Sequence, residues 1–236
     1  MSVAPNILPS SSPQRQEIPP LENGDRLTRA EFERRYEAMP HIQKAELIEG
    51  IVHMPSPVRI KRHGRPHVIL SSWLGHYISK TPGLEEFGDN STVRLDMDNE
   101  PQPDLFLNLP KHAGGTAEID EDDYLTGAPT LACEIAASSV SIDLHIKLHV
   151  YRRNQVREYL VWRTQDRAVD WFAWREGQYE RLALDAQGII KSEQFPGLWL
   201  DQTALVEGNL PALFKALDDG AATEAHARFV EKLRVS

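Results

Sequence analysis

The stretch Leu131–Ala136 (LACEIA) decides the fold class of this 236-residue chain. A short run of apolar and small residues around one carboxylate, Glu134, is typical of a strand buried on both faces of a sheet. Cys133, its neighbour, would then point to the opposite face. An unpaired ionised carboxylate in such a place costs several kcal/mol. Glu134 therefore needs a cation beside it, or a proton.

A second acid stands thirty residues earlier, in Gln102-Pro103-Asp104-Leu105. The alternation of apolar residues over Asp104–Leu109 predicts a strand, and proline is tolerated at a strand's first residue. Two carboxylates at the ends of neighbouring strands, with Lys147 following, predict a Mg²⁺ site, since Mg²⁺ prefers hard oxygen ligands. A structural alternative stays open, because an acid in a strand often pairs with a buried arginine and Pro-Asp is common in turns.

The segment that carries Lys147, Ile142–Val150 (IDLHIKLHV), fits two periods. Its alternating apolar residues would suit a strand. As a helix it forms an apolar stripe that extends to Tyr151, and Asp143 lies one turn from Lys147. The serines just before it are suitable N-caps. We predict a helix.

The same periodicities predict the other elements, which together indicate an α/β fold: a mixed sheet flanked by helices. Helices are predicted at Thr28–Met39, His63–Lys80 and Pro211–Leu233, the last interrupted at Gly220. A hairpin is predicted at Ala45–Met54, with its turn at Glu49-Gly50, and a further strand at Thr92–Met97. Glu118–Asp123 is predicted to be an acidic loop. A C-terminal β-meander is predicted from four strands: Tyr159–Trp162, Ala168–Trp174, Tyr179–Leu184 and Leu198–Leu200.

Composition sets the class of protein. Residues 1–25 hold five prolines and four serines, which predicts a disordered tail before a single domain at 26–236. One cysteine forbids an internal disulfide or a cysteine zinc site and favours a reducing, cytoplasmic setting. No apolar run is long enough to span a membrane. The net charge of −9 argues against a protein that binds nucleic acid by bulk attraction, but not against a nuclease.

One segment, RIKRHGRPH, is basic. Its cations could contact a DNA backbone, which would make affinity depend on salt. They could equally form a solvated loop before a helix. The candidate DNA-binding residues are Arg59, Lys61, Arg62 and Arg65.

Together, PQPDLFL, LACEIAASS and DLHIKLHVYRRNQVREYLVW, preceded by AELIEGIVHMPSP and RHGRPH, resemble the Uma-two family of restriction endonuclease-like proteins, part of the PD-(D/E)XK nuclease superfamily. The resemblance extends over about Thr28–Leu205. It implies a restriction-endonuclease-like core in which Asp104 and Glu134 bind Mg²⁺, or Mn²⁺ as an alternative. The superfamily's lysine two residues after the second acid is absent, because Ala136 stands there, and Lys147 is the residue that would replace it.

The resemblance also implies auxiliary roles for Glu46, Glu49 and His63. It departs from the family at Ile146, where an aspartate is expected before the lysine. The function implied is a Mg²⁺-dependent DNA endonuclease: activated water attacks phosphorus in line and the 3′ oxygen leaves, and a homodimer would let two sites address two strands. The alternative is a non-catalytic binding or assembly module that keeps the fold. Ala136, Ile146 and the negative net charge favour it. A hydrolase of another phosphate ester is a third reading.

Overall fold

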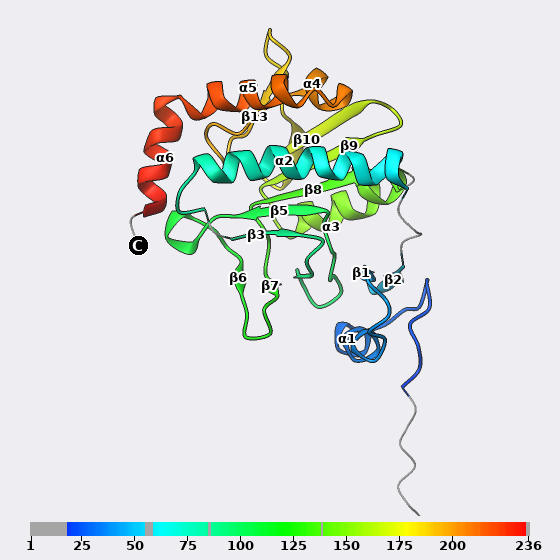
Figure 1. Ribbon diagram of the computed structural model, residues 1–236. Coiled ribbons are helices and arrows are strands. Elements are labelled where there is room, and N and C mark those ends of the chain that lie inside the picture. The colour runs from blue at the N-terminus through cyan, green and yellow to red at the C-terminus, as the bar shows by residue number, and fades with distance from the viewer. Residues whose placement is uncertain (1–17, 55–58, 85, 138, 235–236) are drawn as a thin grey trace, which may run out of the picture.

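The computed structural model describes residues 18–54, 59–84, 86–137 and 139–234 (Figure 1). Its centre is a six-stranded sheet with the order β11-β10-β9-β8-β5-β3. Only β8 and β9 are parallel, and the other neighbours are antiparallel, so the sheet is mixed. The strands are β3 (Glu86–Asp89), β5 (Leu105–Asn108), β8 (Leu131–Ala136), β9 (Glu158–Arg163), β10 (Ala168–Arg175) and β11 (Gln178–Arg181).

Smaller sheets lie beside it. The first is the hairpin β1 (Glu46–Ile48) and β2 (Ile51–His53), whose turn residues Glu49 and Gly50 both have positive φ. The others are β12 (Ile189–Lys191) with β13 (Trp199–Asp201), and β4 (Val93–Arg94) with β7 (Leu125–Thr126) and β6 (Glu118–Ile119).

Two layers of helices enclose the central sheet. The helices are α1 (Arg29–Glu37), α2 (Arg65–Lys80), α3 (Leu148–Arg153), α4 (Gln202–Glu207), α5 (Leu210–Ala221) and α6 (Glu224–Arg234), with π-helical turns η1 (Ile60–Gly64) before α2 and η3 (Ile142–Lys147) before α3, and a 3₁₀ turn η2 (Lys111–Ala113). Figure 1 shows α2, α4 and α5 on one side of the sheet and α3 on the other.

The alternation within β8 explains this sandwich. Cys133 and Ile135 belong to the core cluster shared with α2 and α5, whereas Ala132 and Ala136 belong to the cluster shared with α3. A strand whose two faces both need cover can only lie in the middle of a sheet. The parallel step from β8 to β9 uses η3 and α3 as its crossover, because parallel neighbours require a long connection.

The predicted α/β fold with a mixed sheet is therefore confirmed, as are the buried strand around Glu134 and the helix at Ile142–Val150. Thr28 caps α1 by accepting from the backbone N–H of Glu31. The predicted meander is correct for β9, β10 and β11.

The predicted interruption of the C-terminal helix near Gly220 is confirmed, since α5 ends at Ala221 and α6 begins at Glu224. Two elements differ from their predictions. Leu198–Leu200 is not a fourth meander strand, because β13 pairs with β12 outside the central sheet. The predicted acidic loop begins as strand β6, which its pairing with β7 stabilises.

The predicted tail, residues 1–25, lies outside the described residues up to residue 17. Leu21 is buried in a small cluster with Phe32 and Val52, so packed structure is present from that point. None of the helices in the described part of the chain combines the length and the apolar character needed to cross a bilayer.

Candidate active site

Asp104 and Glu134 lie on neighbouring strands at the same end of the sheet. In the β5–β8 ladder Leu105 is opposite Cys133, so Asp104 is opposite Glu134 one step further along. Oδ2 of Asp104 accepts a hydrogen bond of 2.7 Å from the backbone N–H of Ile135, which fixes the carboxylate where β5 begins. Both acids are only 3% exposed. The structure thus places the two acids on neighbouring strands, as their positions in the sequence predict.

Lys147 connects Glu134 to a third acid. Its ammonium donates at 2.8 Å to Oε1 of Glu134 and at 2.8 Å to Oε1 of Glu46. Lys147 is the last residue of η3, and π-helical turns occur often at functional sites. One turn later, Tyr151 donates its hydroxyl to the same Oε1 of Glu134 at 3.1 Å. Both donors contact Oε1, so Oε2 of Glu134 remains available to a ligand.

Glu46 attaches the β1–β2 hairpin to this cluster. Its Oε1 also accepts from the backbone N–H of Gln102 at 2.7 Å, two residues before Asp104. Glu46 is 7% exposed. The predicted auxiliary acid is therefore in contact with Lys147, and it also helps to hold the segment that presents Asp104.

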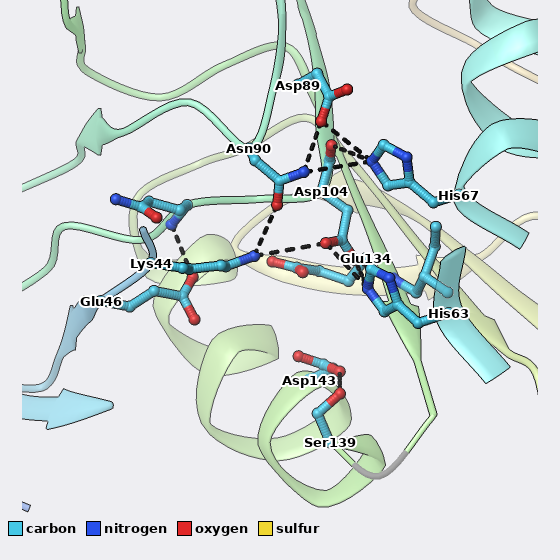
Figure 2. Close-up of polar contacts among 12 residues, drawn as sticks. Lys44, Glu46, His63, His67, Asp89, Asn90, Asp104, Glu134, Ser139 and Asp143 are labelled. Carbon is cyan, nitrogen blue, oxygen red and sulfur yellow. Dashed lines mark hydrogen bonds and ion pairs between the residues drawn. The ribbon is translucent and has the colours of Figure 1, made fainter. Parts of the chain in front are cut away.

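Two further side chains reach Asp104 from opposite sides, as Figure 2 shows. Nε2 of His63, in η1, lies 3.2 Å from Oδ1 of Asp104, and Nζ of Lys44 lies 3.5 Å from the same oxygen. Lys44 is held in turn by Oδ1 of Asn90 at 3.1 Å. Asp104 is thus surrounded by donors, which suits an ionised carboxylate.

The surroundings shift the pKa values of the buried acids in different directions. Burial alone would raise the pKa of Asp104, but the hydrogen bond from His63 and the charge of Lys44 hold that pKa well below its usual range. Burial raises the pKa of Glu134 to about 8, because the charge of Lys147 only partly opposes it. Of the two acids that Lys147 bridges, Glu46 is the one whose pKa is lowered, so it carries the negative charge.

Lys147 itself keeps its proton. Burial would lower its pKa, but the carboxylates of Glu134 and Glu46 hold it well above the usual value. A fourth buried acid, Asp143, lies 4.0 Å from Lys147 and accepts from the Ser139 hydroxyl at 2.5 Å. Burial raises the pKa of Asp143 as well.

The candidate site therefore holds more buried carboxyl groups than cations. The four acids are Glu46, Asp104, Glu134 and Asp143, and they face one fully buried ammonium and the half-buried Lys44. Such an excess of hard oxygen donors in a low-dielectric site fits a divalent cation, whose charge would oppose the effect of burial and lower the pKa of Glu134.

Asp104 and Glu134 are the residues that would hold this cation. Within the described part of the chain, no three histidine, cysteine or carboxylate side chains converge closely enough to hold an ion by themselves. Two carboxylates completed by water and substrate phosphate oxygens are, however, a usual shell for Mg²⁺. The residues fit that arrangement and not a closed, all-protein cage.

Some predicted residues lie elsewhere. Glu49, at the tip of the β1–β2 turn, is not brought to the other acids: it pairs with Arg153 at 2.8 Å, and its side chain is 44% exposed. Of the four predicted DNA-binding residues, all in or next to η1, none contacts Asp104 or Glu134; they are Arg59, Lys61, Arg62 and Arg65, and all are exposed.

The sequence reasoning did not assign site roles to Lys44, Tyr151 or Asp143. Tyr151 and Asp143 each lie four residues from Lys147 in the chain, so helical spacing could have placed all three on one face. Lys44 lies two residues before Glu46. In a strand this spacing predicts only that the two side chains point to the same face. Its contact with Asp104 joins residues sixty positions apart and leaves no local pattern.

Comparison with known proteins gives a family and a similar fold. The sequence profile of one family, described as "Uma2: Putative restriction endonuclease", matches residues 29–203. None of the curated proteins matches the chain. A crystal structure described as a putative nuclease belonging to DUF820, from Anabaena variabilis, has a similar fold, with a TM-score of 0.52 and 11% sequence identity over 78% of this chain and 97% of that one.

Proposed function

This chain belongs to the Uma2 family, and on that premise we propose that it is a Mg²⁺-dependent endonuclease that hydrolyses phosphodiester bonds of DNA. The family and the fold support a nuclease function. The observation that carries the proposal is the convergence of Asp104, Glu134 and Lys147, three residues from separate elements, in one buried cluster.

Each residue has a role that its surroundings support. Asp104, ionised and fixed by the N–H of Ile135, is the permanent anionic ligand. Glu134 would be the second ligand and would release its proton on binding the ion. A bound Mg²⁺ would polarise the phosphoryl group and lower the pKa of the attacking water. Lys147, which remains protonated, would stabilise the charge that develops on the phosphate oxygens.

The lysine at position 147 supplies what the missing lysine at position 136 would have supplied. Ala136 is buried against the α3 side of the sheet and contributes no charge. The ammonium of Lys147 nevertheless reaches Glu134 from η3 at 2.8 Å. This supports an intact site in spite of the departure from the superfamily spacing.

The test is cleavage of supercoiled plasmid DNA in Mg²⁺ or Mn²⁺. We expect nicking by the unaltered chain, loss of at least about a hundredfold in rate for Asp104→Asn and Glu134→Gln, and no change for Asp219→Asn, an exposed acid on α5 that pairs with Lys215. Equal nicking by the unaltered chain and Glu134→Gln would show that these residues are not catalytic.

A second candidate is a non-catalytic binding or assembly module that keeps the nuclease fold. The observation in its favour is that Lys147 already occupies the space between Glu46 and Glu134, so both carboxylates have a partner without a metal ion. This candidate predicts no nicking in either metal, with normal folding of the chain.

A further inference from the structure

Several cations without a described acidic partner lie around η1 and the turn between β9 and β10. Many of the arginines and lysines in the described part of this acidic chain pair with a carboxylate, as Arg94, Arg163 and Arg175 do. Those that contact no described carboxylate within 4.0 Å include Arg59, Lys61, Arg62, Arg65 and Arg167. The first four are in or next to η1, and Arg167 comes from the turn between β9 and β10.

Three of these cations line one pocket of about 240 Å³, which we call the basic pocket. It is smaller than the roughly 300–1,000 Å³ of pockets that hold drug-sized ligands, so it suits a group the size of a phosphate. Its lining residues come from η1 and the start of α2, from the β9–β10 hairpin, and from the end of α4 with the glycine that follows it. The polar residues that line it are Lys61, Arg65, Thr164, Arg167 and Glu207.

The parts of the basic pocket are fixed to one another. Thr164 donates its hydroxyl to the backbone carbonyl of Arg62 at 2.9 Å, which ties the β9–β10 turn to η1. The acid in that turn, Asp166, is already engaged by Arg163. Three cations therefore face a single lining carboxylate, Glu207, and the pocket as a whole attracts anions.

The basic pocket lies on the α2 side of the sheet and Glu134 on the α3 side, and η1 connects the two sites. The turn η1 contributes Lys61 to the pocket and His63 to Asp104. Glu134 is paired in register with Val161 of β9, and Thr164 follows three residues later, about 10 Å further at 3.3 Å per residue.

We propose that the basic pocket binds a backbone phosphate of the DNA substrate a few steps away from the scissile bond. This rests on the proposed function, and it adds Arg167 and Thr164, which are not in the basic segment of the sequence. Arginine suits the role because its planar guanidinium can donate two parallel hydrogen bonds to one phosphate. The Thr164 hydroxyl already donates to the Arg62 carbonyl, so its part is to hold the β9–β10 turn, and Arg167 with it, against η1.

The test measures binding of the full chain to a fluorescently labelled DNA duplex by anisotropy, in EDTA so that the duplex stays intact, over a series of salt concentrations. The variants are Arg167→Asn and Arg65→Gln, with Arg228→Gln on α6 as the control. Arg167 has a φ of 52°, a left-handed conformation that asparagine adopts readily, so this variant removes the charge without straining the turn.

We expect each pocket variant to weaken binding about threefold to tenfold and to lower the slope of log affinity against log salt by about 1. The control should bind as the unaltered chain does. Pocket variants with unchanged affinity and slope, or an unaltered chain that does not bind DNA, would overturn the proposal. Inorganic phosphate is the second probe: if it raises the Tm of the unaltered chain but not of the variants, while DNA affinity is equal in all, the pocket takes free phosphate and the proposal is wrong.

The two proposals fail separately. Weaker binding by the pocket variants of a chain that never nicks plasmid would support the basic pocket and refute the nuclease activity. Metal-dependent nicking with DNA affinity unchanged in the pocket variants would support the nuclease activity and refute the role of the basic pocket.

Discussion

The ammonium of Lys147 lies 2.8 Å from Oε1 of Glu134, a carboxylate thirteen residues earlier in the chain. The two residues come from η3 and β8, and no local repeat brings them together. The same ammonium binds Glu46 of the β1–β2 hairpin. One lysine therefore holds three elements of the site in a fixed arrangement, and much of the expected chemistry depends on it.

Lys147→Met should abolish catalysis and destabilise the fold. Removing one partner of a buried ion pair leaves the other charge without compensation, which costs about 3–5 kcal/mol. We expect plasmid nicking to fall at least about a hundredfold. The double variant Lys147→Met/Glu46→Gln should regain part of the stability, measured by urea unfolding, but none of the activity. If the double variant is less stable than Lys147→Met, the pairing is not the source of the loss.

Divalent metal should stabilise the chain. A ligand that binds only the folded state at a hundred times its Kd adds about 2.7 kcal/mol, which is a rise of roughly 5–10 °C in Tm for a domain of this size. Thermal unfolding with increasing Mg²⁺ or Mn²⁺ measures it. Asp104→Asn and Glu134→Gln should remove the rise, and Asp219→Asn should keep it. A rise that persists in both site variants would place the metal elsewhere.

Tyr151→Phe tests whether the hydroxyl that meets Glu134 positions and tunes that acid. The donated hydrogen bond of 3.1 Å favours the ionised carboxylate, so its loss should raise the pKa of Glu134 further. We expect the pH at which cleavage is half-maximal to move upwards, with a loss of about 1 kcal/mol in stability. The pH profile of nicking distinguishes this from a purely structural role, which would lower stability and leave the profile in place.

Glu100 should make stability depend on pH. It is 3% exposed, and burial, together with neighbouring Glu33, raises its pKa to about 8 from an ordinary value near 4.5. Between these pH values the folded chain keeps a proton that the unfolded chain has released. The free energy of unfolding should therefore be highest below the lower value and fall as the pH rises towards 8.

The matched variant is Glu100→Gln, whose side chain stays neutral at every pH. Urea unfolding at a series of pH values should give a flatter profile for Glu100→Gln than for the unaltered chain. Identical profiles would mean that Glu100 is ionised in the folded state.

The central sheet was predictable to the extent that each strand carries its own pattern. LACEIA has apolar residues on both faces, which predicts a central strand, and β8 is central. The alternation in IDLHIKLHV would suit a strand, but the segment also carries an apolar stripe at helical spacing, and it is helical in the structure. Leu198–Leu200 has a strand pattern too, but pattern does not specify a partner, and β13 pairs with β12 instead of extending the meander. Strand β3 was not predicted, since Glu86–Asp89 includes a glycine and two acids and is stabilised only by its neighbour β5.

The sequence by itself determined which side chains had to find partners: a carboxylate inside an apolar strand, an acid at a strand start, and a lysine one helical turn from Asp143. Only the tertiary structure decided that Lys147 meets Glu134 and Glu46, that Lys44 and His63 reach Asp104, and that Glu49 turns away to Arg153. The reason is physical. Burial is encoded by the period of residues within one element, whereas a contact between elements depends on strand register and crossover geometry, which non-local packing sets.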